Sequence, residues 1–378
     1  MSRQSTGRQV KSRESRLEYN PDYWLLGVVL VLTALGLIMV LSASGIMAER
    51  YWGDKYFFFR KQLLFSLIGL GIMWLSSKIS LSFFYKGFYF CLVLAALLLG
   101  LTLTSFGVQA GGASRWLRVG PVSFQPLEVA KVALVFYLAY FFSNKQELVK
   151  TFSVGFLPPV LVTFALGCLL LLQPDFGGAV YLTLLLFLIS LVGGTRFIYL
   201  FSSLLLASGA AVMLVIHSPY RFRRWFAFLD PFKDAQDSGY QLVQSLYALG
   251  SGKIWGVGLG ASKQKLYFLP DAHNDFILAV LGEELGFIGI SIVFICLAIL
   301  LWRSMRISLQ QTDMQDRFTA FGMSMIVIVG AWLNAAVVLG AVPPKGVPMP
   351  FLSYGGTHLV VMFFCIGVLL NLSRQAAK

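Results

Sequence analysis

Residues 24–41 read WLLGVVLVLTALGLIMVL and contain no charged side chain. An α-helix rises about 1.5 Å per residue, so an apolar run of this length can cross the hydrocarbon core of a bilayer. A cleaved signal peptide is the alternative, because Ser42-Ala43-Ser44 resembles a small-residue cleavage site. The basic leader is too long and the apolar run too extended for a signal peptide. We therefore interpret the stretch as an uncleaved first membrane helix.

Working outward from this helix, further apolar runs recur to the end of the chain and bring the predicted number of spans to about ten. They occupy residues 63–77, 84–105, 127–142, 154–172, 177–193, 197–216, 275–302, 318–341 and 356–372. The fold class predicted is an all-α polytopic membrane protein, with a basic tail at 1–22 and a membrane domain at 23–378. An even number of spans puts both termini on one side, and the basic tail places that side in the cytoplasm.

The composition agrees with this prediction. Of the 378 residues, 57% are hydrophobic and 12% are charged, and the mean hydropathy is +0.76. A soluble domain carries about 25% charged residues. These values exclude a soluble enzyme, a disordered protein and a nucleic-acid-binding domain, whose basic residues need a polar surface. The four cysteines all fall in apolar runs, so neither a disulfide framework nor a zinc site is predicted.

The charge that remains is strongly basic, with 30 Lys and Arg against 17 Asp and Glu, a net +13. On the predicted topology nearly half of the basic residues lie in outer loops, although membrane insertion disfavours them there. This distribution predicts that the outer surface binds a negatively charged partner. Solvated loops, or loops that contact anionic lipid headgroups, are the alternative.

The longest stretch outside the spans, residues 217–274, is predicted to form an ordered cap on the outer surface. Loops of this length are usually functional or disordered, and this one is too aromatic for simple disorder. It opens with Arg221, Arg223 and Arg224 among aromatic residues, which are candidates for substrate binding. Residues 240–249 follow with apolar side chains at helical spacing.

Acidic residues near the outer ends of three spans form the most specific polar pattern. Glu128, Asp175 and the pair Asp271 and Asp275 each follow a proline at the start of a predicted helix. Proline at the first position and an acid behind it are also ordinary helix-start chemistry. The functional alternative is that three helix N-termini converge on one outer cavity that binds a phosphorylated ligand. Lys131, one turn after Glu128, supports the second interpretation.

Asp275 is the candidate catalytic base. It lies where the cap enters an apolar helix, and partial burial there would raise its pKa toward the range that a general base needs. His273 could share its proton network, although a single interfacial histidine is more often structural. Glu283 and Glu284, further along the same helix, predict either a polar path or a structural network, and we favour the network.

The last outer loop, residues 342–358, is rich in proline and glycine, which fix an irregular backbone. Such backbone at membrane depth is tolerated where it is buried in protein or lines a watery cavity. Lys345 would offer a point charge suited to phosphate there, unless the loop is a solvated turn. Ser353 and Tyr354 are further candidates for substrate binding. The glycine-rich residues 256–261 match a dinucleotide pattern only loosely and are interpreted as tight turns.

Four separated motifs, in order, resemble those of the SEDS family (shape, elongation, division and sporulation), and the resemblance covers the chain from Trp24 onward. Two details, Lys345-Gly346 and the residues 258–265, are more similar to the cell-division branch than to the elongation branch. The chain departs from the family pattern at Thr357-His358, where small serines are usual. The motifs are QPLE at 125–128, QPDFG at 173–177, KLYFLPDAHND at 265–275 and PFLSYGG at 350–356.

The resemblance implies a peptidoglycan glycosyltransferase of the bacterial inner membrane that acts at the division septum. Asp275 would deprotonate the acceptor 4-hydroxyl of lipid II, which attacks the growing glycan strand and displaces undecaprenyl pyrophosphate with inversion. The substrate-binding candidates are Glu128, Lys131, Asp175, Arg221, Arg223, Arg224, His273, Lys345, Ser353 and Tyr354. A divalent cation, Mg²⁺ or Mn²⁺, could share the phosphate charge, but no ligand set specifies one. The implied partners are an FtsI-like transpeptidase with a single membrane helix, division regulators and membrane lipid, with no nucleic acid.

Two other functions explain part of the pattern. A lipid II flippase or another transporter of lipid-linked substrates would explain the many spans and the charges of Glu128 and Lys131. Transporters of this kind place functional charges near the midplane on repeated broken helices, and the sequence contains no such repeat. A scaffold without chemistry would leave the acids at the span starts unexplained. We therefore favour the enzyme.

Overall fold

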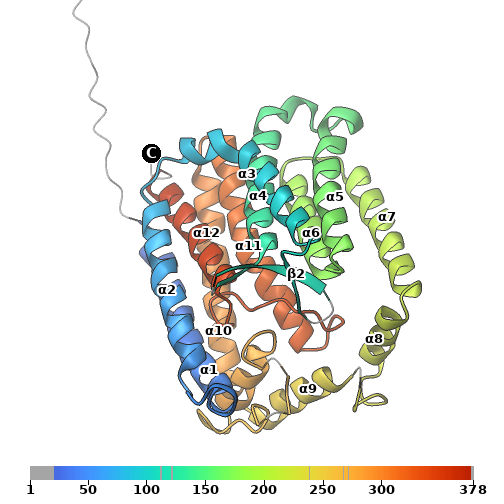
Figure 1. The fold of residues 1–378 in the computed structure, drawn as a ribbon. Helices are drawn as coiled ribbons and strands as arrows, with labels where there is room; N and C mark the ends of the chain where they lie inside the picture. Colours follow the sequence, from blue (N-terminus) through green and yellow to red (C-terminus); the bar gives the residue numbers. More distant parts are fainter. Residues whose placement is uncertain are drawn as a thin grey trace, which may run out of the picture.

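The computed structural model describes residues 21–375, apart from 111–112, 121, 238, 267 and 271. The predicted basic tail therefore lies almost wholly outside the described residues. Ten apolar helices form one bundle, and shorter elements cover the end of the bundle opposite the C-terminus (Figure 1). The bundle helices are α1 (Tyr23–Trp52), α2 (Phe57–Ser76), α3 (Leu81–Leu101), α4 (Pro126–Asn144), α5 (Leu157–Leu172), α6 (Phe176–Val192), α7 (Phe197–Ile216), α10 (Ile277–Gln310), α11 (Met314–Val338) and α12 (Gly356–Gln375).

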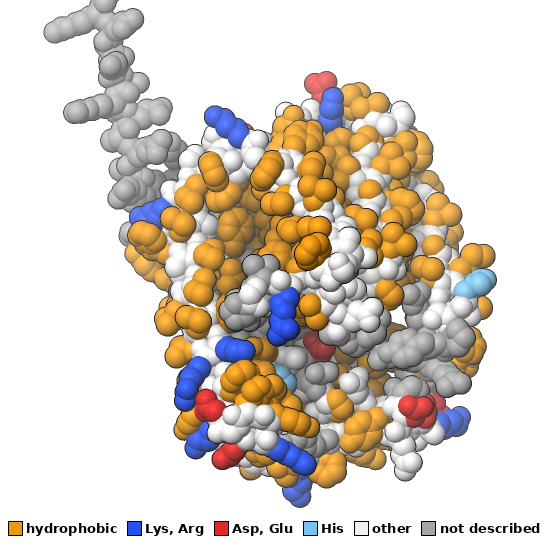
Figure 2. All heavy atoms as spheres, viewed as in Figure 1, with side chains coloured by type: hydrophobic (Ala, Val, Ile, Leu, Met, Phe, Trp, Pro, Cys, Tyr) orange, Lys and Arg blue, Asp and Glu red, His pale blue; other side chains and the backbone are white. Residues whose placement is uncertain are grey.

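The predicted polytopic membrane fold is confirmed in the described part of the chain. Nine helices are long and apolar enough to cross a membrane, and α6 is a shorter apolar helix of 17 residues. Large apolar side chains such as Leu67, Phe90 and Leu206 are exposed around the bundle. Hydrophobic side chains accordingly cover much of the upper part of the face in Figure 2. A surface of this kind matches the hydrocarbon interior of a bilayer rather than water.

Three helices form the centre of the bundle. In the most apolar 18-residue stretch of each of α4, α11 and α12 at least 72% of the residues are buried, whereas in the same stretch of α7 only 6% are buried. Small residues let the central helices approach their neighbours, as where Gly322 of α11 faces Val135 of α4. Close approach at small residues is the usual way in which membrane helices associate. The centre is therefore well packed, while α7 lies at the periphery.

The first difference from the prediction is a small sheet between α3 and α4, a region expected to be a loop. It consists of β1 (Gly107–Ala110), β2 (Ala113–Val119) and β3 (Val122–Phe124), paired antiparallel in the order β1-β2-β3. The hydroxyl of Thr357 in α12 donates to the carbonyl of Ser123 at 3.2 Å. The sheet is thereby attached to the central part of the bundle.

The second difference is a break in α10 at Gly286, whose φ is +64°. Backbone groups freed in an apolar helix need other partners, and here the cap segment 253–258 provides them. The glycines of that region, Gly256, Gly258 and Gly260, all have positive φ and form the predicted turns. The four hydrogen bonds are Val257 N to Glu283 O, Gly258 N to Glu284 O, Phe287 N to Lys253 O and Ile288 N to Ile254 O.

The cap itself contains two helices, α8 (Pro219–Leu229) and α9 (Tyr240–Gly252). The amphipathic helix predicted from residue 240 is confirmed as α9, which buries Leu242 and Val243. The hydroxyl of Ser245 in α9 donates to the carbonyl of Val338 in α11 at 2.8 Å. The cap is therefore ordered and packed against the bundle.

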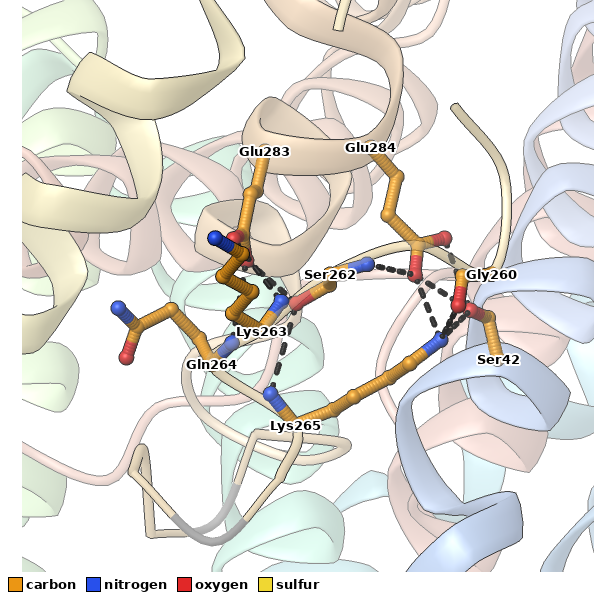
Figure 3. A network of polar contacts seen from close by, with 8 residues as sticks. All are labelled: Ser42, Gly260, Ser262, Lys263, Gln264, Lys265, Glu283 and Glu284. Carbon is orange, nitrogen blue, oxygen red and sulfur yellow. Dashed lines mark hydrogen bonds and ion pairs between the residues drawn. The ribbon is translucent and has the colours of Figure 1, made fainter. Parts of the chain in front are cut away.

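The adjacent acids Glu283 and Glu284 hold another part of the cap, which confirms the predicted structural network (Figure 3). Glu284 is fully buried and lies 3.0 Å from the Lys265 ammonium group, and it accepts a hydrogen bond from Ser42 of α1 at 2.6 Å. Glu283 accepts hydrogen bonds from the Ser262 hydroxyl and, at 3.0 Å, from the amide of Lys263. These contacts join the cap, α10 and α1.

The predicted common design of three helix starts is correct for one helix only. Pro126 begins α4, and Glu128 lies in its first turn. In α6, Asp175 is the N-cap residue, and its carboxylate accepts from the amide of Gly178 at 3.1 Å, so Pro174 lies before the helix. Helix α10 begins only at Ile277, after Asp275. Asp175 is therefore placed as the N-cap of α6, and Asp275 is placed by the turn that precedes α10.

Candidate active site

The segment that carries Asp275 is held by three consecutive backbone carbonyls. Each carbonyl accepts a hydrogen bond from α11 or from the last outer loop. The half-buried Asp275 side chain therefore extends from a backbone that is held in place. Fixed supporting contacts of this kind orient a catalytic group before the substrate binds. The bonds are Tyr354 N to His273 O at 3.0 Å, Ser353 Oγ to Asn274 O at 2.6 Å and Asn334 Nδ2 to Asp275 O at 2.7 Å.

Gly346, in the last outer loop, lies beside the Asp275 carboxylate. A Cβ atom at this position would be 2.9 Å from Asp275 Oδ2 and 3.8 Å from a terminal nitrogen of Arg115. The carboxylate and the guanidinium therefore approach the same point from different elements. The absent side chain of glycine leaves room between them.

Asp175 and Lys345 complete this group of charges. Asp175 is 4% exposed, and its Oδ1 lies 3.5 Å from Nε of Arg115. The ammonium group of Lys345 lies 4.6 Å from the ring centre of Phe176, the first residue of α6. Burial lowers the pKa of Lys345, while the nearby charge of Asp175 opposes that shift. Two carboxylates and two cations thus surround the point next to Gly346.

Arg115 is the residue of this site that sequence analysis missed. It lies on β2, in a segment that was predicted to be a loop. Residues 113–119, ASRWLRV, show no strict alternation of polar and apolar side chains, so the local signal for a strand is weak. Nothing in the sequence indicates that the hairpin folds back over the start of α6, because this is a contact between distant parts of the chain.

Glu128 and Lys131 form a buried cluster with His358, and their roles toward substrate stay predictions. Their charged groups lie 2.7 Å apart, and His358 Nδ1 lies 3.3 Å from the other Glu128 oxygen. The Lys131 ammonium group also lies 4.1 Å above the Tyr181 ring. Glu128, Lys131 and His358 are each no more than 3% exposed. Asp175 and Asp275 both lie near Arg115, and the described contacts of Glu128 are with Lys131 and His358.

Three predicted substrate-binding residues make contacts that support the site. The Ser353 hydroxyl accepts from the amide of Met349 at 2.7 Å while it donates to Asn274. The rings of His273 and Tyr354 both pack against Phe58, at 4.7 and 5.0 Å. Burial lowers the pKa of His273 to about 4, so the ring is neutral at pH 7. Their roles toward substrate stay predictions.

The basic side chains predicted in the cap are not placed. Arg221, Arg223 and Arg224 belong to α8, but their side chains lie outside the described part of the structure, as does Asp271. Their proposed contact with phosphate is therefore untested.

The described residues at the site offer only a partial set of ligands for a metal ion. Among the residues that the structure describes, no three His, Cys, Asp or Glu side chains lie close enough to hold a metal. Asp175, one of the two carboxylates at the site, is already engaged by Arg115 and by the start of α6. The described residues therefore do not fit a resident metal.

Comparison with known sequences gives a consistent result over nearly the whole chain. The profile of the family FTSW_RODA_SPOVE, described as "Cell cycle protein", matches residues 23–378. A probable peptidoglycan glycosyltransferase FtsW of Trichlorobacter lovleyi is 42% identical over 353 residues, which cover 93% of each chain. The stage V sporulation protein E of Bacillus subtilis is 38% identical over 359 residues, which cover 94% of this chain and 98% of that protein.

Solved structures share the fold. A chain of a structure titled "Structural coordination of polymerization and crosslinking by a peptidoglycan synthase complex" superposes with a TM-score of 0.77 at 26% identity. The match covers 95% of this chain and 99% of that one. The rod shape determining protein RodA of Thermus thermophilus superposes with a TM-score of 0.68 at 24% identity, over 95% of this chain and 98% of RodA, and supports the fold alone.

Proposed function

Because the chain belongs to the FtsW, RodA and SpoVE family of cell cycle proteins, we propose that it is a peptidoglycan glycosyltransferase that polymerises lipid II. Relatives about 40% identical over most of their length carry that activity in their names. The observation that carries the proposal is the position of Asp275: a carboxylate on a fixed backbone, beside cations, at the edge of an apolar bundle.

In this reaction Asp275 acts as the general base. Its carboxylate takes the proton of the acceptor sugar 4-hydroxyl, and the bond from that oxygen to the anomeric carbon of the donor forms. The bond from the anomeric carbon to the phosphate oxygen breaks, and its electron pair leaves on undecaprenyl pyrophosphate. Attack opposite to the leaving group inverts the anomeric carbon and gives a β-1,4 link.

The charge that develops on the leaving diphosphate needs stabilisation, and Lys345 is placed to contribute it. Its ammonium group lies beside the start of α6, and the N-terminus of a helix favours a bound anion. Electrostatic stabilisation in a partly desolvated site is usually the largest single contribution to such catalysis. The arginines of α8 are proposed to assist, and the apolar bundle surface would guide the lipid tail.

A polymerisation assay tests the base assignment. The purified protein, with its transpeptidase partner, is given labelled lipid II, and glycan polymer is measured for the wild type and for Asp275→Ala. We expect a loss of at least about 100-fold, as removal of a general base usually causes. The control is Asp54→Asn, an acid at the outer end of the bundle that pairs with the exposed Arg60. Normal polymer from folded Asp275→Ala protein would contradict the assignment.

The lipid II flippase is the second candidate, and the buried Glu128, Lys131 and His358 cluster is the observation that favours it. Coupled transporters often carry such charges within the membrane. The same preparations in vesicles distinguish the two functions. Movement of lipid II across the bilayer without polymer would support the transporter.

We also propose the setting in which the enzyme acts. It is a multi-pass protein, and the basic tail argues for cytoplasmic termini in the bacterial inner membrane. The similarity to FtsW proteins supports a role at the division septum. The similarity to a chain of a peptidoglycan synthase complex supports a transpeptidase partner, and an FtsI-like protein with one membrane helix fits a division role. Co-purification with that transpeptidase from membranes tests the pairing.

A further inference from the structure

A β-bulge places Arg115. Along the β1 and β2 pair, Trp116 faces Val108 and Ser114 faces Gln109, so Arg115 has no opposite residue on β1. A bulge bends its strand and redirects the extra side chain, and bulges are frequent next to active sites. Ala113 and Leu117, on either side of Arg115, are 3% and 7% exposed. The Arg115 side chain itself is 28% exposed, and its Nε lies 3.5 Å from Asp175 Oδ1, so the extra residue of the bulge is directed toward the start of α6.

The hairpin that carries Arg115 is attached at both ends. The Ser114 hydroxyl donates to the carbonyl of Thr102, just after α3, at 2.7 Å. Thr357 of α12 donates to Ser123 of β3. The arginine is consequently held in place before any substrate binds, which lowers the entropy that binding would otherwise cost.

The guanidinium group has donors to spare. Its Nε is buried and makes no hydrogen bond, since Asp175 Oδ1 lies 3.5 Å away. That same oxygen already accepts from the amide of Gly178 at 3.1 Å. A guanidinium has five N–H donors in a planar fork that matches phosphate oxygens. A dedicated structural ion pair would fill these donors, whereas a binding group has to keep some of them available.

We propose that Arg115 binds the diphosphate of the lipid-linked donor, and that Asp175 holds the guanidinium in position until the diphosphate takes its place. The inference rests on the proposed function and names how that site recognises its donor. As the bond from the anomeric carbon to the phosphate oxygen breaks, the electron pair moves onto the diphosphate. Arg115 then donates two hydrogen bonds to its non-bridging oxygens.

Two variants and one control separate this role from a structural one. Arg115→Ala removes the fork, and Arg115→Lys keeps the charge but not the two-point geometry. Arg118→Ala is the control, since Arg118 lies on the same strand with its side chain exposed. Loss of a hydrogen bond to a charged group lowers affinity by about 10- to 100-fold. We expect that fall in kcat/KM for lipid II with Arg115→Ala, partial recovery with Arg115→Lys and no change with Arg118→Ala.

A binding measurement tests the inference without relying on polymerisation. The purified proteins in detergent are titrated with undecaprenyl pyrophosphate, undecaprenyl phosphate and inorganic pyrophosphate. The wild type should prefer the lipid diphosphate to the monophosphate, and Arg115→Ala should lose that preference. Binding of inorganic pyrophosphate that depends equally on Arg115 would show that the headgroup alone is recognised.

The outcomes distinguish the two proposals. An Arg115→Ala protein that is folded, keeps the diphosphate preference and keeps its kcat/KM overturns the inference, whatever the wild type polymerises. If Arg115→Ala does not fold, Arg115→Lys decides by the same two measurements. Failure of the wild type to make polymer, with the Arg115-dependent preference intact, contradicts the glycosyltransferase but not the diphosphate site.

Discussion

At the scale of single residues, Gly346 leaves the space into which the Asp275 carboxylate projects. An added methyl group would lie 2.9 Å from Asp275 Oδ2, so the carboxylate would have to rotate. We expect Gly346→Ala to reduce polymerisation by at least about 10-fold, because small displacements of a catalytic group are costly. The free energy of unfolding should hardly change, since the flexible Asp275 side chain can move away from the added methyl group.

The control for this prediction lies in the same loop. A methyl group on Gly355 would only make an ordinary contact, 3.6 Å from His358 Cβ. Gly355→Ala should therefore retain activity in the same assay. Equal activity of the two variants would show that Gly346 does not shape the site.

His273 makes stability depend on pH. Its pKa is about 4 in the folded protein against 6.5 for an unperturbed histidine. Between these values the unfolded chain binds the additional proton, so stability rises with pH and is lost as pH falls from 6.5 to 4. A shift of this size corresponds to on the order of 3 kcal/mol.

The variant His273→Phe keeps a ring against Phe58 and removes the titration. Thermal unfolding in detergent at pH 7 and pH 4.5 should show a smaller difference for His273→Phe than for the wild type. The exposed His217, replaced in the same way, is the control. An unchanged pH difference in His273→Phe would contradict the prediction.

At this scale sequence reasoning proposed Asp175 and Asp275 because acids at the ends of apolar spans need a reason to be there, and Lys345 because a point charge in the irregular last outer loop suits phosphate. It missed Arg115 because the contact with Asp175 depends on how a hairpin folds over a distant helix. The sequence spacing also could not reveal that His358, on the last helix, lies beside Glu128.

At the scale of elements, the cap is fixed to α10 and α1 through the buried pair Lys265 and Glu284 (Figure 3). Lys265→Met would leave the Glu284 charge buried without its cation, which typically costs about 3–5 kcal/mol. We expect a lower melting temperature and faster proteolysis of the cap.

A double variant provides the internal check. In Lys265→Met with Glu284→Gln, the charge and its partner are removed together, so much of the loss should be recovered. Lys263→Met is the matched control, since only the backbone amide of Lys263 joins the network and its side chain is exposed. Additive losses in the double variant would show that the two charges do not interact.

The positions of the helices could be predicted because apolar runs long enough to span a bilayer leave few alternatives. The break at Gly286 could not, since an isolated glycine in an apolar run usually continues the helix. The short strands β1 to β3 were missed for a similar reason. Their pairing, and not a strong local pattern, makes them a sheet.

At the scale of the whole molecule, both ends of the bundle carry loops, and the proposed orientation assigns them to opposite sides of the membrane. Gln236, between α8 and α9, and Lys145, after α4, are both exposed. In spheroplasts a membrane-impermeant maleimide should label Gln236→Cys directly and Lys145→Cys only after permeabilisation. The wild type, which contains four cysteines, provides the background. The reverse pattern would invert the topology.

The net charge of +13 acquires a more specific meaning in the folded molecule. Several basic side chains are paired internally, as Lys131 is with Glu128, Lys265 with Glu284 and Arg303 with Asp22. Others, including Arg115 and Lys345, lie beside the carboxylates of the outer site. Some basic side chains are thus neutralised inside the bundle, and under the proposed function others at the outer site bind an anion.

The break in α10 also bears on how the protein is made. The carbonyls and amides freed at Gly286 are satisfied by residues 253–258, which precede α10 in the chain and leave the ribosome before it. The partners of the broken turn are thus already synthesised when α10 enters the bilayer. If the cap segment stays beside α10 during insertion, the broken helix enters the bilayer with hydrogen-bond partners already present. Its freed backbone groups are then not exposed to lipid without a partner.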